Sequence, residues 1–418
     1  MPSYIIEGGK RLEGEEYVSG SKNASLPILA STILNAGITK LYNVPNIRDT
    51  KITQEILKFL GCKVKKTKDK IEIDSKNIIK KEIPEHLMHQ MRSTVILAGA
   101  ILGRFKEVMF SYPGGCDIGA RPIDLHLKSF EKLGINILEN AGFIICKCDK
   151  IIGANIDLDF PSVGATENII LASVYAEGVT NITNAAMEPE IADLATCLNK
   201  MGAKIEGAGT SNIKITGVKK LKDISYNIMP DRIEAGSLLC MTAITGGKIK
   251  LNNVIPDHIS PVLNKLEECG CKVKKEKRTV FLEAPKRLKA VDIKTMPYPG
   301  FPTDMQSVFA SMLTVSRGTS IVVENIFENR YKYMSELKKM GAKITIEGKT
   351  AVIKGVRKLS GTKVMSTDLR GGAALVTAGL VAKGKTEITN IEYILRGYEG
   401  LDKKLRNLGA NIEIKEGE

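Results

Sequence analysis

A short glycine motif recurs six times along the chain and constrains its fold more than any other feature of the sequence. Each copy has Leu, Met or Cys before the glycine and ends on Ile or Val: LGCKV, LGINI, MGAKI, CGCKV, MGAKI and LGANI. By subtraction the glycines lie 68 to 73 residues apart, at Gly61, Gly134, Gly202, Gly270, Gly341 and Gly409. An interval this regular indicates six structurally related units.

The sequence around each glycine predicts the elements of one unit. An amphipathic segment such as SPVLNKLEECG ends at the glycine, and an alternating segment such as AKITIEG follows it. The glycine therefore suits a cap between a helix and a strand. A further strand such as GKIKLNNV lies upstream and follows a second helix, so we expect the order βαβαββ in every unit.

The second helix of each unit has almost no polar face. The six segments read SLPILASTIL, STVILAGAILG, TENIILASVYA, AGSLLCMTAIT, MQSVFASMLTV and AALVTAGLVA. A helix that is apolar all round is a buried helix. Because 418 residues exceed one ordinary core, we expect two domains, each with three such helices inside and its strands outside. A stack of six separate layers is the alternative, although solenoid repeats are usually shorter.

Polar and charged residues open these apolar helices. They are Lys22, Asn23, Arg92, residues 162–166, Asp231, Arg232, Asp304, Asp368 and Arg370. Equivalent positions in related units point the same way, so each domain should direct three helix N-termini, which carry partial positive charge, towards one face. Two such faces opposite each other would form an anion-binding cleft.

Composition narrows the class of partner. The formal net charge of +14 favours an anion, either nucleic acid or a small phosphorylated metabolite, but the absence of Trp and an aromatic content of 5% disfavour nucleic acid. No apolar run approaches about 18 residues and the N-terminal residues lack an export signal, so we expect a cytoplasmic protein that does not insert in membranes. The four histidines lie at no ligand spacing from a cysteine pair, so we expect no metal and no other cofactor, and seven of the eight cysteines structural.

Nine motifs together resemble the UDP-N-acetylglucosamine 1-carboxyvinyltransferase family of enolpyruvyl transferases. They are SGSKNASLPIL, PGGCDIGARPIDLH, PSVGAT, EPEI, MPDRIEAG, FPTDMQ, FENR, STDLR and LRGYE, and the resemblance runs from about Ile5 to Ile414. It implies an α/β fold of two inverse α/β barrels, each of three βαβαββ units with buried helices and outer sheets. One domain would span residues 21–229 and the other residues 1–20 and 230–418, with the active site in the cleft between them.

The resemblance also implies an activity. The family transfers the enolpyruvyl group of phosphoenolpyruvate to the 3′-hydroxyl of UDP-N-acetylglucosamine through a tetrahedral intermediate and releases phosphate, the committed step of peptidoglycan precursor synthesis. The shikimate-pathway enolpyruvyl transferase is an alternative that shares the fold but lacks the PGGC loop. An RNA 3′-phosphate cyclase would need a nucleotide-accepting histidine in a motif that is not visible here. A non-enzymatic anion-binding module would not need a reactive cysteine in a glycine loop.

Positive groups are expected to hold the phosphoenolpyruvate. Lys22 stands at a helix start, where its ammonium and backbone N–H groups can both meet a phosphate. By resemblance the phosphoenolpyruvate site comprises Lys22, Arg92, Arg121, Arg370 and Arg396, of which Lys22 and Arg396 also serve catalysis. Such fixed charge would stabilise the anionic intermediate. The alternative interpretation is that these charged residues lie on the surface or cap helices.

Two residues are expected to carry protons. Cys116 lies among glycines and prolines in YPGGCDIGARP, a composition typical of a loop rather than a core. By resemblance its thiol protonates C3 of phosphoenolpyruvate or assists product release, and it is the target of fosfomycin. Asp304 opens an apolar helix and by resemblance takes the proton of the attacking hydroxyl, although a plain N-cap would also explain it.

The remaining predicted contacts belong to UDP-N-acetylglucosamine. By resemblance they are Asn23, Arg92, Arg121, Pro122, Ile123, Asp124, Leu125, Ser162, Val163, Gly164, Asp304, Phe327 and Arg330, with Asp231 and Asp368 in support. The chain departs from the family pattern at two places. Phe160-Pro161 stands where a basic residue is common, and Tyr298 stands where His is common. These departures bear on fine contacts and product affinity.

Overall fold

The computed structural model describes residues 2–112 and 123–416. Their contacts divide the chain into two compact units. The terminal unit lies within Met1–Ser19 and Pro230–Glu418, and the inserted unit takes up the described residues from Gly20 to Met229. Each unit has its own hydrophobic core.

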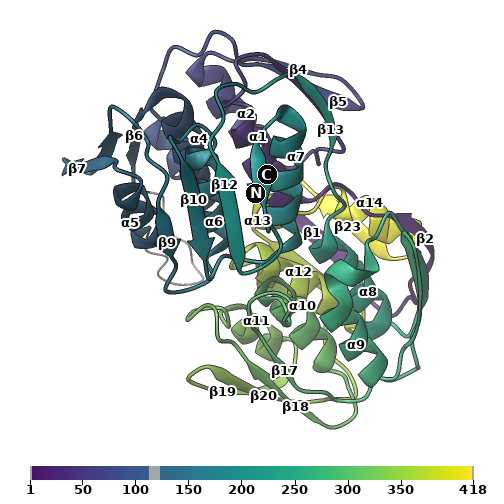
Figure 1. Ribbon diagram of the computed structural model, residues 1–418. Helices are drawn as coiled ribbons and strands as arrows, with labels where there is room; N and C mark the ends of the chain where they lie inside the picture. Colours follow the sequence, from purple (N-terminus) through teal and green to yellow (C-terminus); the bar gives the residue numbers. More distant parts are fainter. Residues whose placement is uncertain (1, 113–122, 417–418) are drawn as a thin grey trace. The chain divides into compact units, whose positions relative to one another are not determined.

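The inserted unit holds three sheets and the helices that pack on them (Figure 1). Its elements are α1 (Lys22–Ser31), β3 (Ile38–Tyr42), α2 (Arg48–Leu60), β4 (Lys63–Lys66), β5 (Lys70–Asp74), α3 (Glu85–Met88), the 3-10 helix η1 (Arg92–Val95), α4 (Ile96–Phe105), β6 (Glu107–Ser111), α5 (Asp124–Lys132), β7 (Asn136–Asn140), β8 (Phe143–Lys147), β9 (Asn155–Asp157), α6 (Val163–Ser173), β10 (Val179–Thr183), α7 (Pro189–Met201), β11 (Lys204–Glu206), β12 (Asn212–Thr216) and β13 (Ile224–Asn227).

The terminal unit repeats this plan with three further sheets. Its elements are β1 (Ser3–Glu7), β2 (Glu13–Tyr17), α8 (Arg232–Ile244), β14 (Lys248–Asn252), the 3-10 helix η2 (Pro256–Ile259), α9 (Ser260–Glu268), β15 (Lys272–Glu276), β16 (Thr279–Glu283), β17 (Ile293–Lys294), α10 (Thr303–Leu313), β18 (Thr319–Val323), α11 (Tyr333–Lys339), β19 (Lys343–Glu347), β20 (Thr350–Lys354), β21 (Lys363–Met365), α12 (Leu369–Gly379), β22 (Lys385–Thr389), α13 (Glu392–Leu395), α14 (Leu401–Asn407) and β23 (Asn411–Lys415).

Five of the sheets within the described residues share one strand arrangement. In the sheet β11-β12-β10-β9, for example, β9 pairs with β10 in parallel, and the pairs β10–β12 and β12–β11 are antiparallel. The sheet β21-β22-β1-β23 has the same order although its strands come from opposite ends of the chain. The structure therefore confirms the prediction that the fold is built from a repeated βαβαββ unit.

The sixth sheet, β6-β8-β7, departs from the pattern because its first strand is reduced to a single bridge between Glu82 and Met109. Two backbone hydrogen bonds join this segment to Met109, from Ile83 N to Met109 O and from Met109 N to Lys81 O. Pro84 comes next and is the N-cap residue of α3, so the chain turns into that helix and the pairing ends.

The six motif glycines end helices as predicted. Each has a positive φ, between 80° at Gly134 and 112° at Gly61. Gly61 and Gly202 are left-handed caps of α2 and α7. A side chain is disfavoured in that conformation, which explains why the motif retains glycine.

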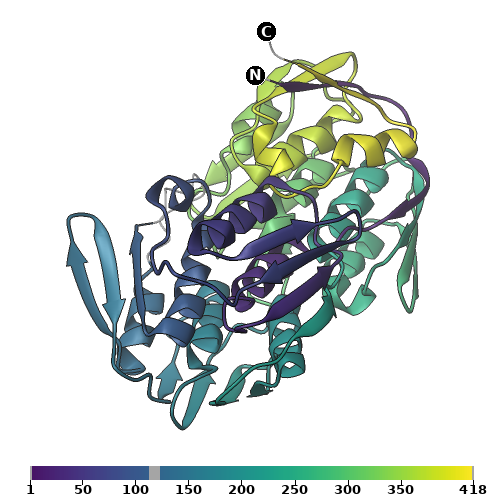
Figure 2. The ribbon, with the colours of Figure 1, turned by 90° about the horizontal axis from the view of Figure 1, so that it is seen from above.

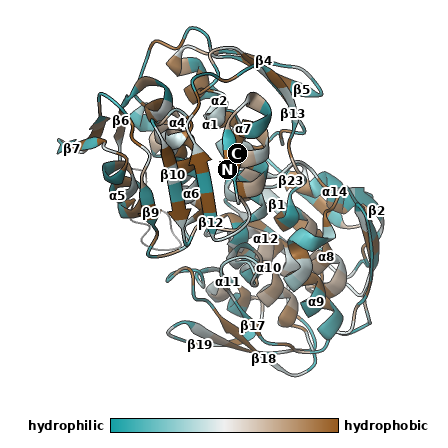
Figure 3. Ribbon diagram, viewed as in Figure 1, coloured by the Kyte–Doolittle hydropathy of each residue, from teal (hydrophilic) through white to brown (hydrophobic). Residues whose placement is uncertain are grey.

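The apolar helices lie inside and the strands outside. All 13 residues of α8 are buried, and α8, α10 and α12 contact one another pairwise. Figure 3 shows hydrophobic and hydrophilic residues alternating along β10 and β12, as expected of strands with one face on a core. In Figure 2 the purple strands β3, β5 and β4 face the viewer, and β4 is largely exposed. Among the described residues, no helix combines the length and apolarity needed to cross a bilayer.

Candidate active site

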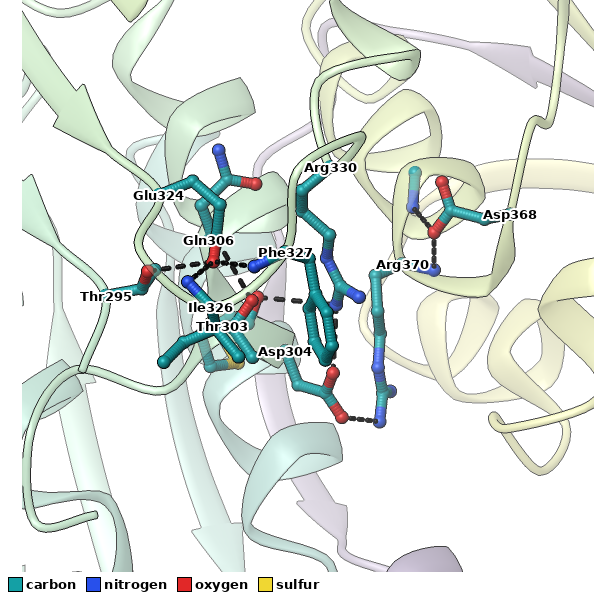
Figure 4. A network of polar contacts seen from close by, with 12 residues as sticks. Thr295, Thr303, Asp304, Gln306, Glu324, Ile326, Phe327, Arg330, Asp368 and Arg370 are labelled. Atoms are coloured by element: carbon teal, nitrogen blue, oxygen red, sulfur yellow. Dashed lines mark hydrogen bonds and ion pairs between the residues drawn. The ribbon is translucent and has the colours of Figure 1, made fainter. Parts of the chain in front are cut away.

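The first turn of α10 holds a carboxylate between two arginines in the terminal unit (Figure 4). Asp304 Oδ1 lies 2.9 Å from Arg330 Nη2, and Asp304 Oδ2 lies 2.9 Å from Arg370 Nη2. Both guanidinium side chains are at most 4% exposed, whereas that of Asp304 is 27% exposed. The only open member of this charged group is therefore the carboxylate.

Asp304 does not cap its helix, which corrects the plain N-cap interpretation. The N-cap position of α10 is Pro302, and no side chain caps the helix there. Asp304 is the second residue of α10, past the cap position, and its carboxylate instead makes charge-assisted hydrogen bonds to the two guanidinium groups. This orientation keeps the partly exposed carboxylate at the helix start.

Arg370 links the starts of α10 and α12 and is itself held by a tyrosine. Its guanidinium lies 5.4 Å from the centre of the Tyr398 ring, and Tyr398 Oη is 2.8 Å from Ser237 Oγ. Burial alone would lower the pKa of Arg370, but the charges of Asp304, Tyr398 and Asp231 raise it above its usual range. Arg370 is thus a permanent positive charge at this site.

Asp231 and Asp368 serve as helix caps. Asp231 Oδ1 accepts from the N–H groups of Ile233 and Glu234 at 2.8 and 3.0 Å. Asp368 Oδ1 accepts from the N–H groups of Arg370 and Gly371, both at 3.0 Å. These contacts fix the starts of α8 and α12.

A buried glutamate organises the segment beside Asp304. Glu324 is 1% exposed and follows β18. Its Oε2 accepts from Thr303 Oγ1 at 3.0 Å, and its Oε1 accepts from Thr295 Oγ1 at 2.9 Å. Oε1 also accepts from the N–H groups of Ile326 and Phe327 at 2.8 and 3.1 Å. One carboxylate therefore joins the start of α10 to the segment that carries Phe327 and Arg330 (Figure 4).

Phe327 and Arg330 lie next to each other on that segment. The guanidinium carbon of Arg330 is 5.4 Å from the centre of the Phe327 ring, and Arg330 Nη2 also donates to Thr303 O at 3.3 Å. Arg396, the remaining predicted residue of the terminal unit, stands at the end of α13 with its backbone N–H bonded to Tyr393 O at 3.3 Å. Its side chain is partly exposed.

In the inserted unit, Lys22 is the first residue of α1 and pairs with a buried aspartate. Lys22 Nζ lies 3.1 Å from Asp49 Oδ2, and the two side chains are 14% and 1% exposed. The cap of α1 is Ser21, whose Oγ accepts from Ala24 N–H at 3.2 Å. Asn23 follows and is partly exposed. Asp49 was missed by sequence reasoning because it belongs to no recognisable motif.

The start of α6 leaves backbone donors available. Ser162 caps it by accepting from Ala165 N–H at 3.3 Å. The N–H groups of Val163 and Gly164 come earlier in the turn and have no partner within the helix. His126 of α5 packs against Gly164, and the charge of Arg92, which opens η1, acts on His126.

The predicted uridine-binding loop is only partly described. Ile123 is buried, Asp124 is exposed at the start of α5, and Leu125 is partly buried. Cys116, Arg121 and Pro122 lie outside the described residues.

The seven cysteines within the described residues are buried and unbridged. Burial raises the pKa of each of their thiols, for example those of Cys146, Cys269 and Cys271 to about 12. Such thiols are unreactive near neutral pH. Within residues 2–112 and 123–416 no group of His, Cys, Asp or Glu side chains could hold a metal ion.

The two departures from the family pattern differ in their surroundings. Phe160, before the start of α6, is 44% exposed. Tyr298 lies near the start of α8, with its ring centre 5.7 Å from the guanidinium carbon of Arg232.

Comparisons with known proteins decide the family. The sequence model of EPSP synthase (3-phosphoshikimate 1-carboxyvinyltransferase) matches residues 6–416. A UDP-N-acetylglucosamine 1-carboxyvinyltransferase 2 of Caldanaerobacter subterraneus subsp. tengcongensis is 52% identical over 413 residues, 99% of each chain. A UDP-N-acetylglucosamine 1-carboxyvinyltransferase of Geobacter metallireducens is 47% identical over 417 residues, 100% of each chain. The chain belongs to the enolpyruvyl transferase family.

Solved structures agree with the fold of this enolpyruvyl transferase. The enolpyruvyl transferase NikO from Streptomyces tendae superposes with a TM-score of 0.90 at 22% identity, covering 100% of this chain and 99% of that one. An EPSP synthase from Acinetobacter baumannii gives 0.77 at 19% identity, covering 99% of this chain and 100% of that one. The predicted α/β fold of buried helices and outer sheets is confirmed.

Proposed function

We propose that this enzyme transfers the enolpyruvyl group of phosphoenolpyruvate to the 3′-hydroxyl of UDP-N-acetylglucosamine and releases phosphate. The observation that carries the choice of acceptor is the identity of about half of all residues, over essentially the whole chain, with transferases named for that substrate. The shikimate-pathway alternative is supported only by the family model and by solved structures of 19% identity. Both substrates are small anions, in keeping with the net charge of +14.

The reaction requires an addition followed by an elimination. The sugar oxygen bonds to C2 of phosphoenolpyruvate while C3 gains a proton and becomes a methyl group. The methyl group then loses a proton and the C2–O bond to phosphate breaks, which restores the double bond. Two proton carriers and a fixed set of cations meet these needs.

In this scheme Asp304 takes the proton of the attacking hydroxyl. Its carboxylate is the exposed end of a group whose arginines are buried. Hydrogen bonds from two guanidiniums stabilise its charged form, so an anion that draws Arg370 away from it would make Asp304 a stronger base. The phosphate or carboxylate of phosphoenolpyruvate is such an anion, which couples substrate binding to proton removal.

The other predicted roles form part of the same proposal. Lys22, Arg92, Arg121, Arg370 and Arg396 would hold phosphoenolpyruvate, and Cys116 would protonate C3 or assist product release and react with fosfomycin. The start of α6, residues 123–125, Phe327 and Arg330 would bind the UDP-sugar. The two domains would have their boundaries at 20/21 and 229/230, within one residue of those of the two compact units. The enzyme would work in the cytoplasm, because phosphorylated metabolites of this kind do not cross membranes unaided.

The test is a phosphate-release assay with two acceptors. Phosphoenolpyruvate should release phosphate in the presence of UDP-N-acetylglucosamine and not with shikimate 3-phosphate. Turnover with shikimate 3-phosphate alone would favour the alternative acceptor. An absence of phosphate release with both acceptors would contradict an enolpyruvyl transferase activity.

A further inference from the structure

His126 is a buried residue for which the proposed mechanism has no use, and one edge of its ring faces a helix start. It lies in α5 and is 7% exposed. A Cβ atom built on Gly164, in the first turn of α6, would lie 3.1 Å from His126 Cε1 and 3.4 Å from Nε2. Because Gly164 has no side chain, the edge of the His126 ring can occupy this space. Nε2 stands beside the backbone of the α6 first turn.

The surroundings of Asn168 determine which ring nitrogen carries the proton. Asn168 Oδ1 accepts from Gly99 N–H at 2.8 Å, and its Nδ2 donates to Val95 O at 3.1 Å. These two backbone groups fix the orientation of the amide, because an N–H can only donate and a carbonyl can only accept. The second Nδ2 hydrogen points to His126 Nδ1 at 2.6 Å, so Nδ1 is the acceptor.

A neutral imidazole that accepts at Nδ1 carries its proton on Nε2. His126 is neutral near pH 7, because burial, assisted by the positive charge of Arg92, lowers its pKa to about 4. Within the described residues Nε2–H makes no hydrogen bond. Asn168 thus fixes the donor at Nε2, on the ring edge that faces Gly164.

Three donors therefore lie at the start of α6: His126 Nε2–H and the backbone N–H groups of Val163 and Gly164. We propose that His126 donates a hydrogen bond from Nε2 to a diphosphate oxygen of the bound UDP-sugar, and that Asn168 positions the ring for this contact. This inference rests on the proposed function, which supplies the diphosphate. The neutral imidazole would give the site a hydrogen-bond donor without placing a second full positive charge next to Arg92.

Two variants of His126 separate the ligand contact from the packing contact. The amide of His126→Gln reaches the position of Nε2, whereas that of His126→Asn reaches only the position of Nδ1. Dissociation constants for UDP and for uridine are measured by calorimetry on wild type and both variants. His126→Asn should weaken UDP about ten- to a hundredfold, the usual size for a lost hydrogen bond to a charged group. His126→Gln should restore most of this loss, and uridine affinity should stay unchanged in both.

Unchanged UDP affinity in His126→Asn would overturn the proposal. An equal loss of uridine and UDP affinity would also overturn it, because that result indicates a disturbed uridine loop. In wild type, two-bond ¹H–¹⁵N spectra of the ring should show the proton on Nε2 and a shift of that nitrogen on addition of UDP; a proton on Nδ1 would contradict the argument. If wild type binds neither UDP nor UDP-N-acetylglucosamine and releases no phosphate, the proposed function fails instead.

Discussion

At the scale of single residues, the site depends on carboxylates whose partners could not be inferred from their position in the sequence. Asp231, Asp304 and Asp368 all stand at helix starts, yet two cap their helices and one does not. Asp231 and Asp368 are N-cap residues, whereas Asp304 is the second residue of α10 and pairs with Arg330 and Arg370. We therefore assign the base role to Asp304 and a structural role to the other two.

Replacing Asp304 with Asn tests this assignment. The amide keeps the shape but cannot take a proton, so kcat should fall by about 10²- to 10⁴-fold, the usual contribution of a general base. Stability should also fall, because two buried guanidiniums lose their counterion. Asp402→Asn is the matched control: Asp402 is 4% exposed and its Oδ2 lies 2.7 Å from Arg406 Nη2. It should affect the melting temperature while leaving kcat near wild type. Equal kcat values for the two variants would refute the assignment.

At the scale of elements, Glu324 joins the end of β18 to the start of α10. Such a contact orients Asp304 relative to Phe327 and Arg330 without touching a substrate. Thr303 supplies the link to the helix, through its hydroxyl at 3.0 Å from Oε2. A displacement of about 1 Å at a reacting group can cost on the order of a hundredfold in rate.

Thr303→Val should break that link and Thr303→Ser should keep it. We expect Thr303→Val to lower kcat/KM for UDP-N-acetylglucosamine about ten- to a hundredfold. Its cost in unfolding free energy should be about 1–3 kcal/mol, because Glu324 Oε2 is left without that donor in a buried setting. Steady-state kinetics and thermal unfolding give both values. If the serine variant is as impaired as the valine variant, the hydroxyl link is not what matters.

At the scale of the whole molecule, the sequence predicts the fold better than it predicts the site. The six glycines and six apolar helices are local patterns in the sequence. They suffice to predict the fold because every unit buries its apolar helix in the same way. Contacts between distant segments are different: Asp49 beside Lys22, Glu324 beside Thr303, and His126 beside Gly164 join elements whose sequences carry no mark of one another. Resemblance supplied the residues proposed to meet a substrate, and the structure supplied Asp49, Glu324 and Asn168, which hold them.

The central claim is that the chain breaks the C2–O bond of phosphoenolpyruvate and bonds C2 to the sugar oxygen. The most direct measurement uses phosphoenolpyruvate labelled with ¹⁸O at the bridging oxygen, together with UDP-N-acetylglucosamine, and mass spectrometry of both products. Addition followed by elimination predicts that all of the label leaves with phosphate, and that the UDP-sugar gains one enolpyruvyl group without label. Label retained in pyruvate or in the UDP-sugar, or a UDP-sugar of unchanged mass, would contradict the account.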